Sequence, residues 1–218
     1  MVGSRDGDQV IWYENVDGGY TLGVSLSGSP TGAEALTVNP ASNAIYDIAG
    51  NVANTSQAYN TAYLNDVTGP TMTITAADGM VIINDGSTTN NSTLSLTFIS
   101  SETTTNFVVG DITVSGGSLS SFSGSGTTYY ATFTPSGSGA TTIDVAGSTF
   151  TDAAGNDNSA ASQFNWTYDG TLPAITGVSL ASDNSTVAVT FSEAVYNTAG
   201  GSGSLETSDF VFSISGGS

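Results

Sequence analysis

Short stretches in which apolar and polar residues alternate recur along this chain. Residues 94–98 read LSLTF and residues 187–191 read VAVTF, so every second side chain of each stretch is apolar. A period of two is typical of a β-strand with one buried face. The same pattern predicts strands over residues 36–38, 129–133, 141–145 and 210–214. Gly-Gly, Ser-Gly and Asp-Gly pairs separate these stretches and no helical periodicity competes with them, so the pattern predicts an all-β protein.

Three motifs occur twice, which indicates an internal repeat. The stretch NSTLSLTF at 91–98 matches NSTVAVTF at 184–191, and a Ser-Glu pair follows each, ending at Glu102 and Glu193. DIAGN at 47–51 matches DAAGN at 152–156, and DVTGP at 66–70 matches DGTLP at 169–173. The copies lie about one hundred residues apart, which is the length of one small β-sandwich domain.

The order of these motifs predicts the domain organisation. Residues 67–169 contain the full series, so they are expected to form a complete immunoglobulin-like sandwich. Residues 1–66 contain only the later motifs and residues 170–218 only the earlier ones. The chain is therefore predicted to hold one complete domain, preceded by the C-terminal half of a sandwich and followed by the N-terminal half of another.

Composition narrows the possible functions. Nineteen acidic residues face one basic residue, Arg5, and the net charge of −18 disfavours nucleic acids and anionic membranes as partners. The excess acid either serves a divalent cation or keeps a surface protein soluble. Without Cys, His or Lys the chain has no disulfides, no ordinary zinc site and no general base beyond carboxylates, so no enzyme is expected. No apolar run approaches the ~20 residues that span a bilayer, so no membrane insertion is expected.

With these motifs assembled, the sequence resembles the bacterial immunoglobulin-like repeats that occur in tandem in large cell-surface adhesins. The resemblance rests on the Phe-x-Ser-Glu strand end at 191–193, loosened to FISSE at 98–102, on the two Asp-x-Ala-Gly-Asn turns and on the two Asp-x-Thr-x-Pro linkers. It implies extracellular extension or binding modules on a bacterial surface, without catalytic activity. It also implies calcium at the junctions between domains, because many members bind it there.

The sandwich geometry predicts where the acidic residues meet. In such a fold the entry linker, the connection after the second strand and the turn before the last strand lie at one pole. In the middle domain this brings together Asp66, Glu102, Asp111, Asp152 and Asn156, and in the split domain Asp169, Glu193, Asp209, Asp47 and Asn51. Clustered oxygen ligands in flexible turns suit Ca²⁺, so these ten residues are the candidate metal ligands.

Two simpler interpretations stand beside these. Asp-x-Ala-Gly-Asn is also a good tight turn without any ion, since Gly adopts positive φ and Asp and Asn bond to their own backbone. Aromatic residues form the second case: Trp12, Trp166, Tyr59, Tyr63, Tyr129 and Tyr130 would form either a sugar-stacking platform or parts of the core. Burial of the tryptophans would favour a structural role over a binding role.

The predicted function is that of an extracellular structural or adhesive repeat protein, a stalk or head-to-tail filament made rigid by calcium. The alternative is a glycan- or protein-binding adhesin module. The two half-domains are complementary, so they are expected to complete each other between neighbouring copies, as in strand complementation. The other possibility is that these 218 residues are a window of a longer tandem array, whose adjacent repeats complete the halves.

Overall fold

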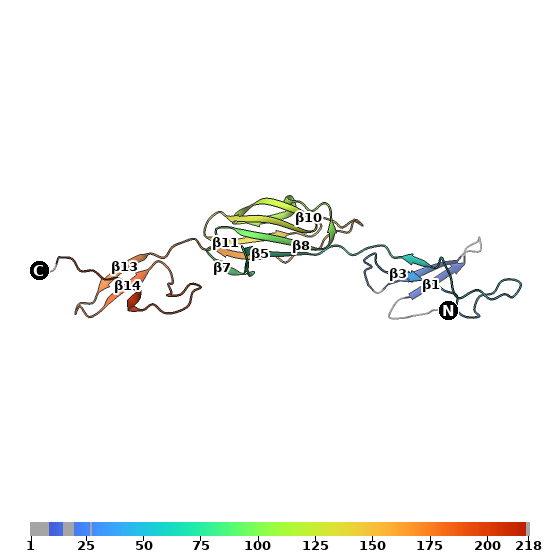
Figure 1. Ribbon diagram of the computed structural model, residues 1–218, viewed down its shortest axis with the longest axis horizontal. Coiled ribbons are helices and arrows are strands. Elements are labelled where there is room, and N and C mark those ends of the chain that lie inside the picture. The colour runs from blue at the N-terminus through green and yellow to red at the C-terminus, as the bar shows by residue number, and fades with distance from the viewer. Residues whose placement is uncertain (1–8, 15–19, 27, 217–218) are drawn as a thin grey trace. The chain divides into compact units, whose positions relative to one another are not determined.

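The computed structural model describes residues 9–14, 20–26 and 28–216 (Figure 1). It divides into two compact units, Met1–Tyr168 and Asp169–Ser218, which are described separately below. Regular structure in the described residues consists of β-strands and two short 3₁₀ turns, η1 (Val109–Asp111) and η2 (Thr207–Asp209). The predicted all-β class is confirmed.

The centre of the chain is a β-sandwich of two four-stranded sheets. One sheet has the order β10-β8-β5-β6, formed by Gly117–Pro135, Leu94–Thr104, Met72–Asp78 and Val81–Ile83. The other has the order β7-β12-β11-β9, formed by Ser87–Thr89, Phe164–Tyr168, Gly139–Val145 and Ile112–Ser115. Pairing is antiparallel except between β12 and β7. This is a β-sandwich of the immunoglobulin-like class that the sequence predicts.

The two sheets share one apolar core. In β8 the residues at 94, 96, 98, 100, 102 and 104 point to the core side, and Leu94, Leu96 and Phe98 are fully buried. The opposite sheet contributes Ile143, Val145 and Trp166, and Trp166 donates its indole N–H to Thr89. Burial of a leucine, isoleucine, valine or phenylalanine side chain in this core stabilises the fold by roughly 1.5–3 kcal/mol.

The first part of the chain contains two separate hairpin-like pairs. β1 (Gln9–Glu14) pairs with β2 (Tyr20–Ser25), and β3 (Ala35–Thr37) pairs with β4 (Thr61–Tyr63). The side chains of Leu22 and Val24 in β2 lie outside the described residues. The apolar side chains around β3 are poorly covered, since Val38 is 44% and Ile45 54% exposed.

The second unit is a two-stranded hairpin with a long return. β13 (Ile175–Leu180) pairs with β14 (Val187–Phe191), and η2 follows. The strand predicted over residues 210–214 is absent here, and that prediction is wrong for this structure. The equivalent strand of the sandwich, β9, pairs with β11, and residues 169–216, the described part of the second unit, contain no equivalent of β11. Alternation alone therefore did not produce a strand where no neighbouring strand supplies the ladder hydrogen bonds.

Candidate metal site at the linker end of the sandwich

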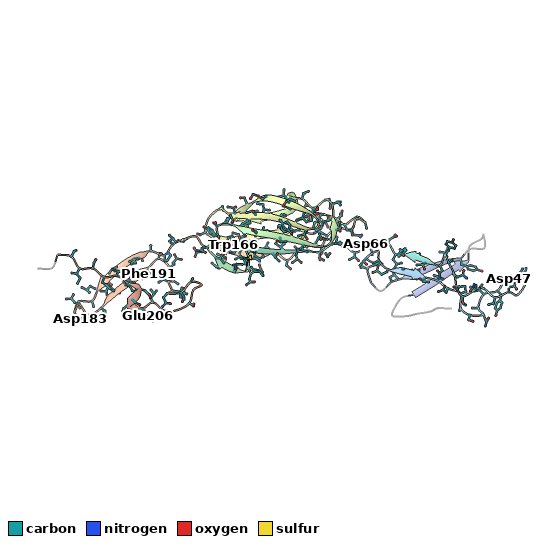
Figure 2. The ribbon with its side chains drawn as sticks, in the orientation of Figure 1. Asp47, Asp66, Trp166, Asp183, Phe191 and Glu206 are labelled. Carbon is teal, nitrogen blue, oxygen red and sulfur yellow. The ribbon has the colours of Figure 1, made fainter. Side chains whose placement is uncertain are left out.

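The linker at residues 66–70 is fixed by contacts on both of its sides. Val67 donates its N–H to the Pro30 carbonyl at 2.9 Å, and Ser159 donates its N–H to the Pro70 carbonyl at 3.0 Å. Asp66 closes a local turn in which its Oδ1 accepts the Thr68 N–H at 3.0 Å. These contacts consequently hold the Asp66 carboxylate at the end of the sandwich (Figure 2).

Glu102 reaches the same place from β8. It has the same parity as the buried residues of that strand, so its side chain leaves the strand on the core side, close to the end of the sheet. Burial raises the pKa of Glu102, and the negative charges of Asp66 and then Asp152 raise it further. No basic side chain in the described residues offsets this, because the only Lys or Arg of the chain is Arg5. Glu102 is thus a carboxylate that its surroundings disfavour as an anion.

Asp152 completes the group from the turn before the last strand. Its backbone forms a bridge with Thr104, two residues beyond Glu102, and this contact brings the turn to the end of β8. The Asp152 carboxylate accepts the Asn156 N–H and the Asn156 side-chain amide, both at 2.8 Å. Burial raises the pKa of Asp152, but the hydrogen bonds from Asn156, Gly155 and Ala154 together lower it below its ordinary value. The surroundings of Asp152 therefore favour its ionised form, whereas the surroundings of Glu102 disfavour ionisation.

Ligand oxygens of Asp66, Glu102 and Asp152 all lie within 4.8 Å of one another. Two oxygens bound to one Ca²⁺ at 2.3–2.6 Å are at most about 5 Å apart, so each pair among these oxygens lies within the span that one ion bridges. The donors are hard oxygens, as Ca²⁺ requires, and a cation would cancel the repulsion that disfavours the Glu102 anion. The three residues fit a calcium ion, which still needs backbone oxygens or water to fill its remaining positions.

The comparison with known proteins concerns this same stretch of chain. A family model described as a bacterial Ig-like domain matches residues 66–168. Residues 66–168 are a bacterial Ig-like domain. Such domains are typically non-enzymatic structural modules of surface or extracellular repeat-type proteins. A comparison with curated proteins and one with solved structures each found no match. No helix among the described residues has the length and apolar character needed to cross a bilayer.

Two other predicted ligands of the Ig-like domain lie differently. Asp111 is not part of the three-carboxylate group: its Oδ2 accepts the Val108 N–H at 2.8 Å and thereby caps η1. Asn156 is close to the group but its side-chain amide donates to Asp152, which makes it a positioning residue for that carboxylate in this structure. The turn interpretation of Asp-x-Ala-Gly-Asn therefore holds here together with the candidate site.

The candidate ligands of the split domain fall into both units. Asp169 repeats the Asp66 turn, accepting the Thr171 N–H at 3.1 Å, and Asp209 repeats the Asp111 cap by accepting the Glu206 N–H at 2.8 Å. Glu193 has a buried Oε1 with no hydrogen-bond partner in the part of the chain that the structure describes. In the first unit, Asn51 donates its side-chain amide to Asp47 at 2.7 Å. Metal binding by these five residues stays a prediction.

The aromatic residues of the Ig-like domain are mainly core. Trp166 is 1% and Tyr129 4% exposed, and Tyr129 donates its hydroxyl to the Thr104 carbonyl at 2.9 Å. Tyr130, Tyr59 and Tyr63 are exposed, and the Trp12 side chain lies outside the described residues. Burial of Trp166 removes one of the two tryptophans from the sugar-stacking platform and favours a structural role.

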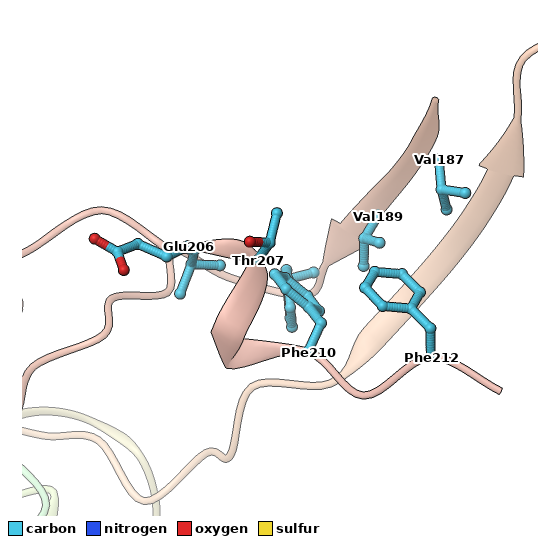
Figure 3. Close-up of a pocket in the computed structure, with 8 residues that line it drawn as sticks. Val187, Val189, Glu206, Thr207, Phe210 and Phe212 are labelled. Carbon is cyan, nitrogen blue, oxygen red and sulfur yellow. The ribbon is translucent and has the colours of Figure 1, made fainter. Parts of the chain in front are cut away.

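Sequence reasoning missed part of an apolar groove in the second unit. The groove has a volume of about 370 Å³ and is lined by Val187, Val189, Phe191, Leu205, Glu206, Thr207, Phe210 and Phe212 (Figure 3). Five of these are apolar residues of the alternating stretches 187–191 and 210–214, whereas Leu205, Glu206 and Thr207 were not noticed. The equivalent carboxylate caps of η1 and η2 provide the signal that could have found them. When Asp209 is aligned with Asp111, Leu205 aligns with the buried Phe107.

Proposed function

We propose that this chain is a segment of an extracellular structural or adhesive array, in which calcium bound by Asp66, Glu102 and Asp152 fixes the entry linker to the Ig-like domain. The observation that carries the proposal is the meeting of three carboxylates from the linker, β8 and the penultimate turn without a basic neighbour. Calcium in such a site would connect parts of the chain that the backbone alone holds less firmly. The linker would then transmit orientation from one domain to the next.

The chemistry of the domain favours this role over the alternatives. The buried Trp166 argues against a glycan platform in the Ig-like domain. A glycosidase would need its acids in an open cleft beside a sugar-binding surface, whereas Asp152 is buried and bonded to its own turn. A linker site with hard oxygen ligands needs no such cleft.

Thermal unfolding of the chain in calcium and in chelator tests the proposal. Tryptophan fluorescence monitors the unfolding, and a Trp12→Phe background ensures that Trp166 alone reports on the Ig-like domain. If the site has a dissociation constant of roughly 10⁻⁴ M, calcium at about one hundred times that concentration adds about 2.7 kcal/mol to the free energy of unfolding. For a domain of this size the melting temperature should rise by roughly ten degrees.

Glu102→Gln separates the site from general charge effects. The neutral amide removes the repulsion with Asp66 and Asp152, so this variant should melt at a higher temperature than the parent in chelator and gain much less from calcium. Asp144→Asn in β11 is the control, since it removes one negative charge from the same domain outside the group. Equal gains from calcium in the parent, Glu102→Gln and Asp144→Asn would exclude the proposed site.

A further inference from the structure

The groove of the second unit is the open half of a sandwich core. Val187, Val189 and Phe191 correspond in the repeat to Leu94, Leu96 and Phe98, which are all 0% exposed in the Ig-like domain. Through the shared caps, Leu205, Phe210 and Phe212 correspond to Phe107, Ile112 and Val114. In the second unit none of these positions is fully buried: Val187 is 44% and Phe212 67% exposed, and the other four are half-buried (Figure 3).

The Ig-like domain shows what covers such a groove. Its equivalent residues pack in one cluster with Phe133, Ile143, Val145, Phe150, Phe164 and Trp166, which come from β10, β11, β12 and the turn between the last two. The cover also supplies hydrogen bonds, since β9 exists as a strand through its pairing with β11. Residues 210–213, the equivalents of β9, have the same alternation but form no strand. They lack both the apolar cover and the neighbouring strand.

The equivalents of these covering elements lie in the first part of the chain. β3 pairs with β4 as β11 pairs with β12, and Asn43 and Ser148 both adopt a left-handed backbone conformation, with φ of 55° and 59°. The following turns have the same hydrogen bonds, Gly50 N–H to the Asp47 carbonyl and Gly155 N–H to the Asp152 carbonyl.

Counting from these turns, Val38 and Ile45 correspond to Ile143 and Phe150. Ile143 and Phe150 are 0% and 1% exposed, whereas Val38 and Ile45 are 44% and 54% exposed. The first part of the chain thus carries uncovered residues at the positions where the second unit needs a cover.

We propose that residues 35–66 of a second copy of this chain complete the sandwich begun by residues 169–218. Residues 37–40 of one copy, at the end of β3, would pair along residues 210–213 of the other as β11 pairs along β9. Val38 and Ile45 of the first copy would enter the groove between Val189, Phe191 and Phe210. The contact repeats the interface between β11 and β9 inside the Ig-like domain, so its register is already specified. Because donor and acceptor surfaces differ, the contact is heterologous and extends head to tail through strand addition.

Two variants test this pairing. Val189→Asp places a carboxylate in the groove, and Val38→Asp places one on the donor, so each variant loses one side of the contact and retains the other. The parent chain should form oligomers whose mass increases with concentration in light scattering after size exclusion, and each variant alone should be a monomer. An equimolar mixture should form a dimer and nothing larger, because one functional donor meets one functional groove. Formation of that dimer also shows that neither variant is merely unfolded.

The controls reverse the face of the strand. Ala188→Asp and Thr37→Asp lie next to the two test positions, on the opposite face of β14 and β3, and should oligomerise as the parent does. A parent chain that stays monomeric at all concentrations, variants that oligomerise like the parent, or a mixture that remains monomeric would each overturn the proposal. The melting of the Ig-like domain in calcium, measured on the same variants, tests the metal site separately, so failure of one proposal does not conceal the other.

Discussion

The Ig-like domain and the unit Asp169–Ser218 contain the same local structure with opposite degrees of burial. In the domain, Thr71 and Ser101 exchange two hydrogen bonds, and Ala174 and Ser192 exchange the same two in the second unit, all between 2.8 and 2.9 Å. The capped 3₁₀ turns also agree. Local sequence therefore determines hairpins, caps and turns in both places. Burial of the apolar face and the strand after the cap occur only where the later strands are present.

The largest difference should appear in the cost of removing one aromatic ring at equivalent positions. Phe98→Ala empties a fully buried site in contact with Phe107 and should lower the free energy of unfolding by about 3–5 kcal/mol. Phe191→Ala changes the open groove and should leave the unfolding of the Ig-like domain unchanged. Denaturant unfolding in the Trp12→Phe background, observed through Trp166 fluorescence, measures the stability of the Ig-like domain in both variants. A comparable loss in the two variants would show that the two regions do not differ as described.

A smaller effect is expected at the linker of the domain. A Cβ on Gly69 would lie 1.9 Å from the Asp157 carbonyl oxygen, so Gly69→Ala must displace the linker and Asp66 with it. We expect a loss of roughly 1–3 kcal/mol and a weaker gain from calcium. Gly137→Ala is the matched control, because nothing lies within 4 Å of its added Cβ. If the two alanine variants melt alike in calcium, close packing of the linker does not position Asp66.

The smallest effect concerns protonation in chelator. Carboxyl resonances in NMR should give Glu102 a pKa above the ordinary glutamate value and Asp152 a pKa below the ordinary aspartate value. The folded state then binds the Glu102 proton more tightly than the unfolded state does. The contribution of Glu102 to stability therefore decreases as the pH rises from its unfolded pKa through its folded pKa. Asp152 contributes in the opposite direction: its stabilisation is present above the unfolded pKa and is lost as pH falls through the folded one. Both groups titrating at ordinary values would remove the electrostatic basis of the site.

Much of the fold was accessible from the sequence because it repeats. Alternation at 94–98 and 141–145 identified core strands, and the duplicated DAAGN motif located the turn that positions Asp152. The strand at 210–214 was predicted wrongly because alternation describes a face and does not supply a neighbouring strand.

The candidate site was predicted less completely than the fold. Topology brought Asp66, Glu102 and Asp152 to one pole, and the structure gathers these three. Topology could not predict that the Asp111 carboxylate caps its own 3₁₀ turn, because the spacing of residues alone does not show which hydrogen bonds a side chain makes.

Calcium titration of the whole chain, observed through its side-chain carboxyl resonances, tests the central claim most directly. The claim predicts that Asp66, Glu102 and Asp152 shift together and saturate with one dissociation constant of roughly 10⁻⁴ to 10⁻³ M, while Asp144 and the exposed Asp183 scarcely respond. Weak shifts that continue without saturation and spread evenly over all of these carboxylates would show only general screening of an acidic protein, and would contradict the claim.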